Sequence, residues 1–557
     1  MIRRWIYAGI LIFVLVFLGK GFMLQADTMF GFHDGTQAGR VSDFSVSIAE
    51  GYIPPRMAPN FSHQRGYPVF NHYAPLAYYV TAGLHFAGMG IPYALKVSFF
   101  VAVLTAGIGM WLFMKNHVTE EGALVGGLVY ATSAYMGTEI FVRGNLAEVW
   151  FLAVFPLALW SIDRYVRLKT FNALALMIVC GACVLLAHNV LSLVGFAIIL
   201  LYGITYRNAL VIAGILTSIS LAGSYLFPSL LELSQTHAQS IALQTAYTNH
   251  FLCVRQIWNS PIGYAGSIPG CVDGMSFQLG KVLIVLGTLG AGMWIVARVR
   301  DRFVRGESRL AQQLLILCIG FVSLYSASNY SMSIWEALPA IQVMQFPWRM
   351  LVFTMFAGAY FSGYALSVIP QITLARGIAG VCIAMSVYLA IPFFTPNPDA
   401  QWSTDVYKDM YLSQDYIQNK IAYQVPEYIP LSVEIDAWLK LRDTSEGLAQ
   451  DKIMPLDGGE VIPLDIKPFS YTGATSSKNF YLDIHTAPFW EVKIDNAVRT
   501  PDRVDELGRP YFTTEQEKTI IDITYIQTPL QKLSNAISLV TGVLLVGLCL
   551  KKWKPAR

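Results

Sequence analysis

The sequence has few charged residues. Asp, Glu, Lys and Arg make up 13% of its 557 residues, whereas about 25% is usual in soluble domains. Hydrophobic residues make up 54%, and the mean hydropathy is +0.47. The net charge of +3 comes from cations scattered among short loops. Because a nucleic-acid-binding surface needs a concentrated basic patch, nucleic acid is not expected as a partner. The composition predicts a membrane protein.

Cysteine is also scarce. Cys180 and Cys183 have the CxxC spacing of a metal site, but no second pair follows, so packing inside an apolar segment is the expected role. Cys253 and Cys271 share one loop expected outside the membrane, and we predict a disulfide between them if that face is oxidising. No small-residue cleavage site follows the first 25 residues, which predicts an uncleaved first helix rather than a secretory signal. The sequence has no internal repeat.

Long apolar stretches are abundant. Stretches of roughly 17–25 residues are long enough to cross a bilayer. About twelve are present, at 5–24, 93–114, 121–137, 146–163, 171–188, 190–206, 209–231, 279–298, 310–327, 348–368, 377–394 and 531–550. The apolar segment 74–89 is short and interrupted by Pro75 and His85, which predicts an amphipathic helix at the membrane surface.

Lys and Arg predict the orientation of these spans, because cytoplasmic loops carry an excess of both. With the amino terminus inside, every even-numbered span ends in positive charge, including the arginine cluster at 298–309 and the basic tail at 551–557. Counting 74–89 as a span would place that arginine cluster outside. Both termini are therefore expected in the cytoplasm, and the chain in a cytoplasmic membrane.

The expected fold is a polytopic α-helical membrane protein with an external β-rich domain near its carboxyl end. Residues 1–394 form the transmembrane domain, with external loops at 25–92 and 232–278. Residues 395–530 alternate polar and apolar side chains in short runs such as 519–525, which is typical of half-buried strands. Residues 531–557 form the last span and a cytoplasmic tail.

Asp34 is the first candidate for catalysis. It lies just beyond the outer end of the first span and precedes a glycine, so the chain can turn and present the carboxylate. A base at that depth can take a proton from an acceptor while the other substrate stays in lipid. A capping role for Asp34 at the next helix is the plain structural alternative. That alternative does not account for the titratable side chains nearby.

The same external loop holds further candidates for substrate binding. Cationic, hydrogen-bonding and aromatic side chains suit a phosphate or a sugar ring, and the loop contains His33, Arg40, Glu50, Arg56, His63, Arg65, Tyr67 and His72. An interfacial aromatic belt explains the tyrosines but explains the His and Arg residues less well. Oxygen ligands around Asp34 would suit Mg²⁺ or Mn²⁺, which is a second possibility.

Other candidates lie at the outer ends of later spans. Arg143 and Glu148 flank a turn, where a structural ion pair is as good an explanation as a functional role. His188 precedes Asn189 at the outer end of another span, where a packing role is the default interpretation. Arg349 follows Trp348 at the start of a span, either as an interfacial anchor or as a cation that holds a lipid phosphate.

Together these motifs resemble a known family. The pieces that match are His33-Asp34-Gly35, residues 51–56, Gly66-Tyr67-Pro68, Arg143-Gly144 with Glu148, His188-Asn189 and Phe346-Pro347-Trp348-Arg349. The chain resembles the GT-C superfamily of integral membrane glycosyltransferases, and within it the bacterial YfhO-like group, also called 6-pyruvoyl-tetrahydropterin-synthase-related. Residues 488–496 are similar to that group's PGW-x-V-x-V-D-G strand pair, with Phe489 and Asn496 replacing two glycines.

The resemblance implies a polyprenyl-phosphate-linked sugar as donor and a glycan, lipid or protein as acceptor on the external face. It also implies that the acidic residue Asp34 is catalytic. Nothing in the sequence supplies the zinc-binding histidines of a pterin enzyme. A transporter of a lipid-linked substrate and a non-catalytic scaffold or accessory subunit of an envelope complex are the alternatives. Transporters tend to carry broken helices and mid-membrane charges, whereas the charges here gather at the outer face.

Overall fold

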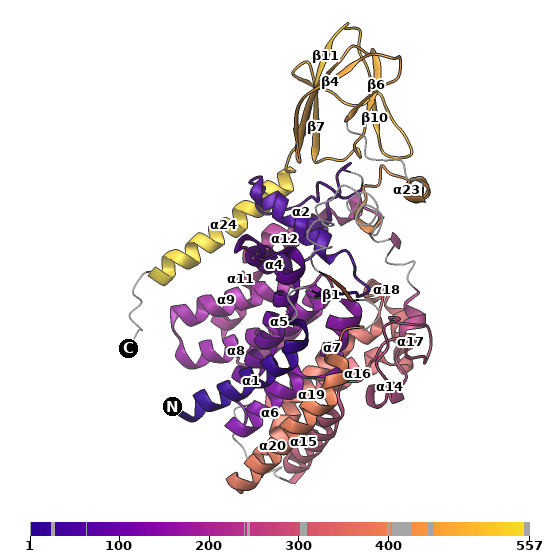
Figure 1. Cartoon of the computed structure of the whole chain (residues 1–557). Coiled ribbons are helices and arrows are strands. Elements are labelled where there is room, and N and C mark those ends of the chain that lie inside the picture. The colour runs from indigo at the N-terminus through magenta and orange to yellow at the C-terminus, as the bar shows by residue number, and fades with distance from the viewer. Residues whose placement is uncertain are drawn as a thin grey trace.

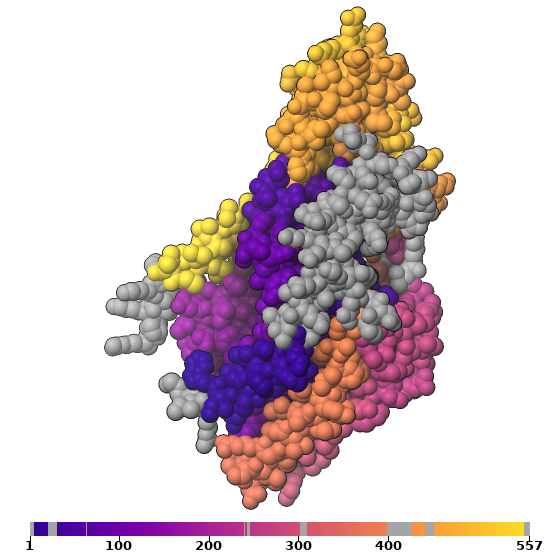
Figure 2. All heavy atoms as spheres, viewed as in Figure 1, coloured from indigo at the N-terminus to yellow at the C-terminus, as the bar shows by residue number. Residues whose placement is uncertain are grey.

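The computed structural model describes residues 2–23, 28–62, 64–238, 240–241, 246–300, 309–397, 401–403, 426–443 and 451–550. A helical part lies below a smaller β-rich part, and the two meet near α2 (Gln37–Ala49) and the start of α24 (Pro529–Leu550) (Figure 1). The β-rich part stands above the helices as a separate lobe in the space-filling view (Figure 2). His63 lies outside the described residues.

The amino-terminal helices follow the predicted apolar stretches closely. They are α1 (Ile2–Met23), α3 (Val69–His72), α4 (Leu76–Phe86), α5 (Ile91–Met114), α6 (Glu120–Ala131), α7 (Ala134–Thr138), the π-helix η1 (Glu139–Arg143), α8 (Leu146–Leu168), α9 (Phe171–Leu185), α10 (Leu191–Ile204), α11 (Ala209–Leu221) and α12 (Gly223–Leu231). Helix α4 has only 11 residues, which gives a length of about 16 Å, too short to cross a bilayer.

Further helical segments follow along the chain. They are η2 (Leu233–Gln235), η3 (Tyr247–His250), α14 (Val254–Trp258), α15 (Lys281–Arg300), α16 (Leu310–Ala327), η4 (Asn329–Ser331), α17 (Met332–Ala337), α18 (Pro339–Gln342), η5 (Pro347–Met350), α19 (Leu351–Ser367), α20 (Ile372–Ala390), η6 (Ile391–Phe394), η8 (Pro426–Tyr428) and α23 (Ile435–Asp443). Helix α19 is central and packs against α15, α6 and α16.

Seven helices of the described residues are long and apolar enough to cross a membrane. The count rises to eight if α11 and α12, which are bent by 70° at Ala222, form one span. Helices α9 and α10 and the middle of α1 are apolar but shorter. The chain is therefore a multi-helix membrane protein, and the number twelve stays a prediction.

Small residues allow the central helices to approach closely. A Cβ on Gly287 of α15 would lie 2.8 Å from the Gly358 carbonyl oxygen of α19. Such contacts drive helix association in lipid, where burial of apolar surface provides little force. Only 22%, 33%, 28% and 11% of the most apolar stretch of α15, α16, α20 and α24 is buried inside the protein, as expected for helices that face lipid.

The β-rich part contains two antiparallel sheets. The strands are β3 (Ile453–Pro455), β4 (Val461–Lys467), β5 (Ser470–Thr475), β6 (Asn479–Leu482), β7 (Trp490–Ile494), β8 (Ala497–Val498), β9 (Arg503–Val504), β10 (Pro510–Thr513) and β11 (Thr519–Tyr525). One sheet has the order β3-β6-β10-β9 and the other the order β4-β5-β11-β7-β8. On β11, Ile521 and Ile523 are buried whereas Ile520 is exposed, which confirms the predicted alternation.

A short pair of strands joins distant parts of the chain. Strand β1 (Thr28–Phe30) follows the first helix and pairs antiparallel with β2 (Gln401–Ser403), which follows α20. This pairing fixes the segment just before Asp34, so it contributes to the position of the first candidate residue.

Candidate active-site cavity

A cavity of about 820 Å³ lies at the ends of several helices beneath the β-rich part. Seven of the predicted site residues line it, from five separate parts of the chain: His33, Asp34, Arg40, His72, Arg143, His188 and Arg349. Glu148 is fully buried and contacts Arg143 and Arg349. The structure thus brings together eight residues that the sequence places up to several hundred positions apart.

Asp34 is held in place by the residues that follow it. Its two carboxylate oxygens accept hydrogen bonds from Thr36 Oγ1 at 2.8 Å and Gln37 Nε2 at 2.6 Å, and Arg40 Nη1 lies 3.6 Å away. No backbone N–H of α2 is capped by the Asp34 side chain among these contacts, so the simple capping role does not describe it. The side chain is 28% exposed and reaches the cavity.

The Asp34 segment is also bonded to the turn that carries Arg143. The backbone N–H groups of His33 and Asp34 donate to the carbonyls of Val142 and Arg143, both at 2.9 Å. Gly144 lies in the left-handed region at φ 63°, and a Cβ there would collide with the Phe32 ring. Only glycine allows the two segments to approach this closely.

Arg143 and Arg349 form the cationic wall of the cavity, and two glutamates are buried behind them. Arg143 Nη1 contacts Glu139 at 2.5 Å and Glu148 at 2.8 Å, and Arg349 Nε lies 3.8 Å from Glu148. Burial raises the pKa of Glu139, although the Arg143 charge opposes this. The arginines line the cavity whereas the glutamates do not, so this wall favours an anion.

Arg349 has hydrogen-bonding capacity that the protein leaves unused. Its Nη1 donates to the Met344 carbonyl at 2.9 Å, whereas its Nε is buried without a hydrogen-bond partner among the described residues. A buried donor without a partner is costly. The nearest carboxylate oxygen to this Nε is Glu148 Oε2, at 3.8 Å.

His188 has a defined tautomer. Its Nδ1 accepts hydrogen bonds from the backbone N–H groups of Val190 at 3.2 Å and Leu191 at 3.3 Å, at the start of α10. Because Nδ1 is an acceptor, the imidazole is neutral and its proton is on Nε2. His188 therefore offers the cavity an N–H donor.

The cavity also has an apolar side. Leu193 of α10, Leu230 of α12 and Val343 after α18 line it and are 44%, 51% and 37% exposed. Exposed aliphatic side chains beside a cationic wall suit an amphiphile with an anionic headgroup.

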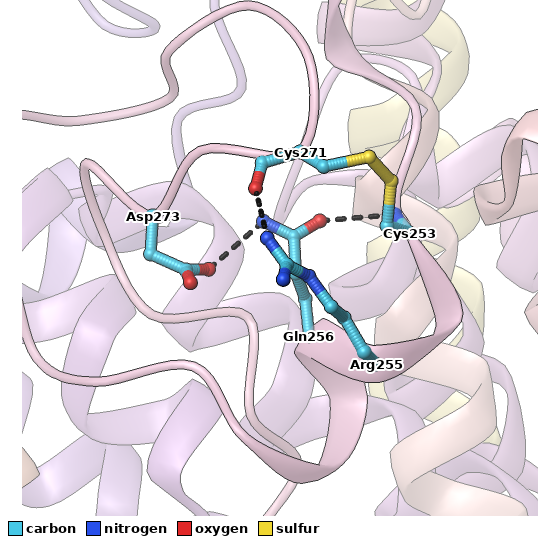
Figure 3. The surroundings of a disulfide bond; sticks show 5 residues. All are labelled: Cys253, Arg255, Gln256, Cys271 and Asp273. Atoms are coloured by element: carbon cyan, nitrogen blue, oxygen red, sulfur yellow. Dashed lines mark hydrogen bonds between the residues drawn. A yellow bond between two sulfur atoms is a disulfide. The ribbon is translucent and has the colours of Figure 1, made fainter.

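The loop that contains the disulfide forms another wall. Cys253 and Cys271 are bonded, with their Cα atoms 5.6 Å apart, which confirms the predicted pair. Gln256 accepts from the Cys253 N–H and donates to Asp273, and Arg255 donates to the Cys271 carbonyl (Figure 3). The loop closed by this bond contains Gly266, whose backbone lies against the His33 ring.

Four predicted site residues lie away from the cavity and have structural roles. Arg56 donates to Asn71, Asn535 and the Ser224 carbonyl, and Arg65 is paired with Asp483 of the β-rich part at 2.6 Å. Tyr67 is buried beside Tyr428, and Glu50 ends α2. None of the four side chains lines the cavity, so their positions do not support the predicted substrate-binding role.

Two polar residues of the cavity were not predicted from the sequence. Glu427 and Tyr428 line it from the long segment after α20. Burial raises the pKa of Glu427, and the Tyr428 ring stacks on His72 with the ring centroids 5.6 Å apart. Two prolines bound the segment 426–430, but no spacing relates it to the first loop.

No group of three His, Cys, Asp or Glu side chains suited to a metal ion occurs among the described residues. Asp34 and His33 are neighbours. The other groups that contact the Asp34 carboxylate, Thr36 Oγ1 and Gln37 Nε2, donate hydrogen bonds to it rather than accept them. Binding of Mg²⁺ or Mn²⁺ beside Asp34 therefore stays a prediction.

Comparison of the whole fold with solved structures finds membrane glycosyltransferases. The arabinofuranosyltransferase AftD from Mycobacteria is 14% identical at a TM-score of 0.45, over 71% of this chain and 27% of that one. The Archaeoglobus fulgidus oligosaccharyltransferase in its apo form is 11% identical at 0.42, over 74% of this chain and 60% of that one. The chain thus spans about a quarter of AftD's length, and TM-scores below 0.5 do not establish a common fold.

Comparison by sequence identifies the family. No curated protein matches the chain. Residues 70–393, more than half of the 557, match the model of the 6-pyruvoyl-tetrahydropterin synthase related domain, described as a membrane protein. This match confirms the predicted resemblance to that group and includes Arg143, His188 and Arg349. The chain belongs to the 6-pyruvoyl-tetrahydropterin synthase related family of membrane proteins.

Proposed function

We propose that this protein is a membrane glycosyltransferase that moves a sugar from a polyprenyl-phosphate donor to a glycan, lipid or protein acceptor. One observation carries the proposal: a carboxylate, a pair of arginines and exposed aliphatic side chains line the same cavity. A lipid-linked sugar phosphate presents the complementary groups, since it combines a hydrocarbon chain, one anionic phosphate and a polar ring.

The donor phosphate is placed against Arg349 and Arg143. The Arg349 guanidinium and the Nε2–H of His188 supply donors to its oxygens, and guanidinium groups bind phosphate especially well. The hydrocarbon chain leaves along Leu193 and Leu230 towards the lipid.

Asp34 acts as the general base of an inverting transfer. It takes the proton from an acceptor hydroxyl or amine as the acceptor atom bonds to C1 of the sugar, and the bond from C1 to the phosphate oxygen breaks. The phosphate retains the electron pair, and Arg349 stabilises its growing negative charge. Thr36 and Gln37 orient Asp34 for this step.

The proposal includes the orientation of the chain. Twelve spans, cytoplasmic termini and an external segment 395–530 in a bacterial cytoplasmic membrane would place the cavity at the outer surface. The distribution of Lys and Arg supports this orientation.

The decisive experiment replaces Asp34 in the full chain reconstituted in lipid vesicles with polyprenyl-phosphate sugars. Asp34→Asn keeps the size of the side chain and one of its two acceptor oxygens but removes the base, so transfer should fall about 10²- to 10⁴-fold. Donor binding should be unchanged. Asp465→Asn is the matched control, because Asp465 is half exposed on β4 and far from the cavity lining. Normal transfer by Asp34→Asn would refute the catalytic role.

The bend between α11 and α12 favours one other candidate, a transporter of a lipid-linked substrate. Residues 209–231 contain no Asp, Glu, Lys, Arg or His, so this break offers no charged group at mid-membrane. Movement of a labelled lipid across the vesicle membrane, without sugar transfer, would support that candidate.

A further inference from the structure

A second cavity, of about 300 Å³, lies where the helical part meets the β-rich part. Its lining comes from α3, the segment after α12, residues 430–432, the loop 486–489 and the start of α24. Sites between two structural units are common places for small-molecule ligands, and this volume is at the lower end of such sites.

His72 lines both this cavity and the larger one. Its ring stacks on Tyr428, and its two nitrogens face the Ser229 carbonyl at 3.5 Å and Asn71 Nδ2 at 3.4 Å. Burial lowers the pKa of His72 to about 4, so the ring is neutral at neutral pH. His72 is therefore an uncharged side chain that the two cavities share.

The lining of the second cavity differs from that of the first. None of its lining residues is Lys or Arg, and Glu232 is its one carboxylate. Glu232 is held by three neutral donors: Asn71 Nδ2 at 2.8 Å, Gln531 Nε2 at 2.9 Å and Thr528 Oγ1 at 2.5 Å. No cation on this lining compensates for a bound anion, so an anionic ligand is disfavoured.

The other lining groups suit a sugar. Ser234, Thr236, Ser432 and Thr486 supply hydroxyl oxygens, and Phe489 supplies an aromatic ring. Hydroxyls and amides pair with sugar hydroxyls, while an aromatic ring packs against the apolar face of a sugar.

We propose that the second cavity is the acceptor site and binds a neutral, hydroxyl-rich carbohydrate, whose reacting end passes His72 towards Asp34. This inference rests on the proposed glycosyl transfer for its biological role, but the binding itself is measurable without transfer. It assigns the anionic donor to the cationic cavity and the neutral acceptor to the cavity without cations.

The binding is tested by protection of a cysteine at the cavity rim. Ser234 is exposed there, so Ser234→Cys is introduced into the full chain in nanodiscs after the free cysteines are changed to alanine. The free cysteines are Cys180, Cys183, Cys318, Cys382 and Cys549. The probes are neutral hexasaccharides of glucose, galactose or mannose and a sulfated hexasaccharide, and the readout is the rate of N-ethylmaleimide labelling.

At least one neutral hexasaccharide should slow labelling of the cysteine at 234 threefold or more, and the sulfated one should not. Gln516→Cys, on an exposed turn of the β-rich part, should label at the same rate with every probe. Protection by the sulfated probe, or by none of the neutral ones, would overturn the inference.

A second variant separates this inference from the proposed function. Ser234→Trp fills the rim, so transfer to an acceptor should fall at least tenfold while polyprenyl-phosphate binding stays at the wild-type level. Unchanged transfer in Ser234→Trp would refute the acceptor site alone. Absence of transfer in the wild-type chain, together with protection at position 234, would refute the proposed function alone.

Discussion

The Arg143 guanidinium lies over the ring of Trp348, 4.5 Å from its centre. Trp348 is fully buried and directly precedes Arg349, whose own guanidinium lies 4.9 Å from the centre of the Phe346 ring. The stacking joins the η1 turn to the start of α19. This contact explains how two spans present their arginines to one anion.

Trp348→Leu should therefore weaken the binding of a polyprenyl phosphate. A cation–π contact contributes about 0.5–2 kcal/mol, which corresponds to roughly 2- to 30-fold in affinity. Trp258→Leu is the control, because the Trp258 ring also lies near a cation, Lys281, but does not line the cavity. Equal affinities for the two variants, measured in nanodiscs, would contradict the role of this ring.

Gly144→Ala should lower sugar transfer by at least tenfold while the chain still inserts into the membrane. The added methyl group would collide with Phe32 and displace the Asp34 segment from the Arg143 turn. Gly458→Ala is a matched control, since Gly458 also has a positive φ, of +79°, but has no atom within 4 Å of the added Cβ. If both variants lose transfer equally, backbone strain rather than Asp34 displacement is responsible.

Loss of the disulfide should loosen the wall beside His33. A crosslink across 18 residues stabilises the folded loop by about 3 kcal/mol. In the double variant Cys253→Ser/Cys271→Ser, hydrogen exchange of residues 260–270 should become faster and donor affinity should fall. Cys549→Ala removes a free cysteine instead and should change neither. Unaltered exchange in the double variant would show that other contacts hold the loop.

The stability of the first loop should depend on pH through Asp43. Burial raises the pKa of Asp43 to about 7, and both oxygens accept hydrogen bonds from Asn60. An acid with a raised pKa binds its proton more tightly when folded, so its stabilising contribution is complete below about pH 4 and is lost as pH rises to about 7.

Hydrogen exchange of residues 57–61, corrected for the intrinsic rate, should therefore accelerate between pH 4 and pH 7 and level off above pH 7. Asp43→Asn, which does not titrate, should show no such acceleration. The opposite trend in the wild-type chain would mean that Asp43 is ionised throughout.

Much of the fold could be predicted because it depends on local patterns. Apolar length predicted the long helices, and alternation predicted strands such as β11. The pairing of Cys253 with Cys271 and the shared cavity of Arg143 and Arg349 followed from their expected side of the membrane.

The sequence did not predict which polar residues line the cavity and which form contacts elsewhere in the fold. Arg56 and Arg65 have the same chemistry as Arg40, but their partners Asn535 and Asp483 lie 479 and 418 positions away in the sequence. A single sequence does not reveal such contacts. The same limitation concealed Glu427 and Tyr428, and with them the position of His72 between two cavities.

The pairing of Arg56 with Asn535 has a consequence for how the protein is made. At synthesis rates of about 5–20 residues per second, Asn535 emerges from the ribosome roughly 25 to 100 s after Arg56. During that interval one donor of a guanidinium that is buried in the finished protein has no acceptor, and α24 cannot yet pack against α12. The first loop thus completes its contacts only after the last helix has been synthesised, although neither Arg56 nor Asn535 lines the cavity.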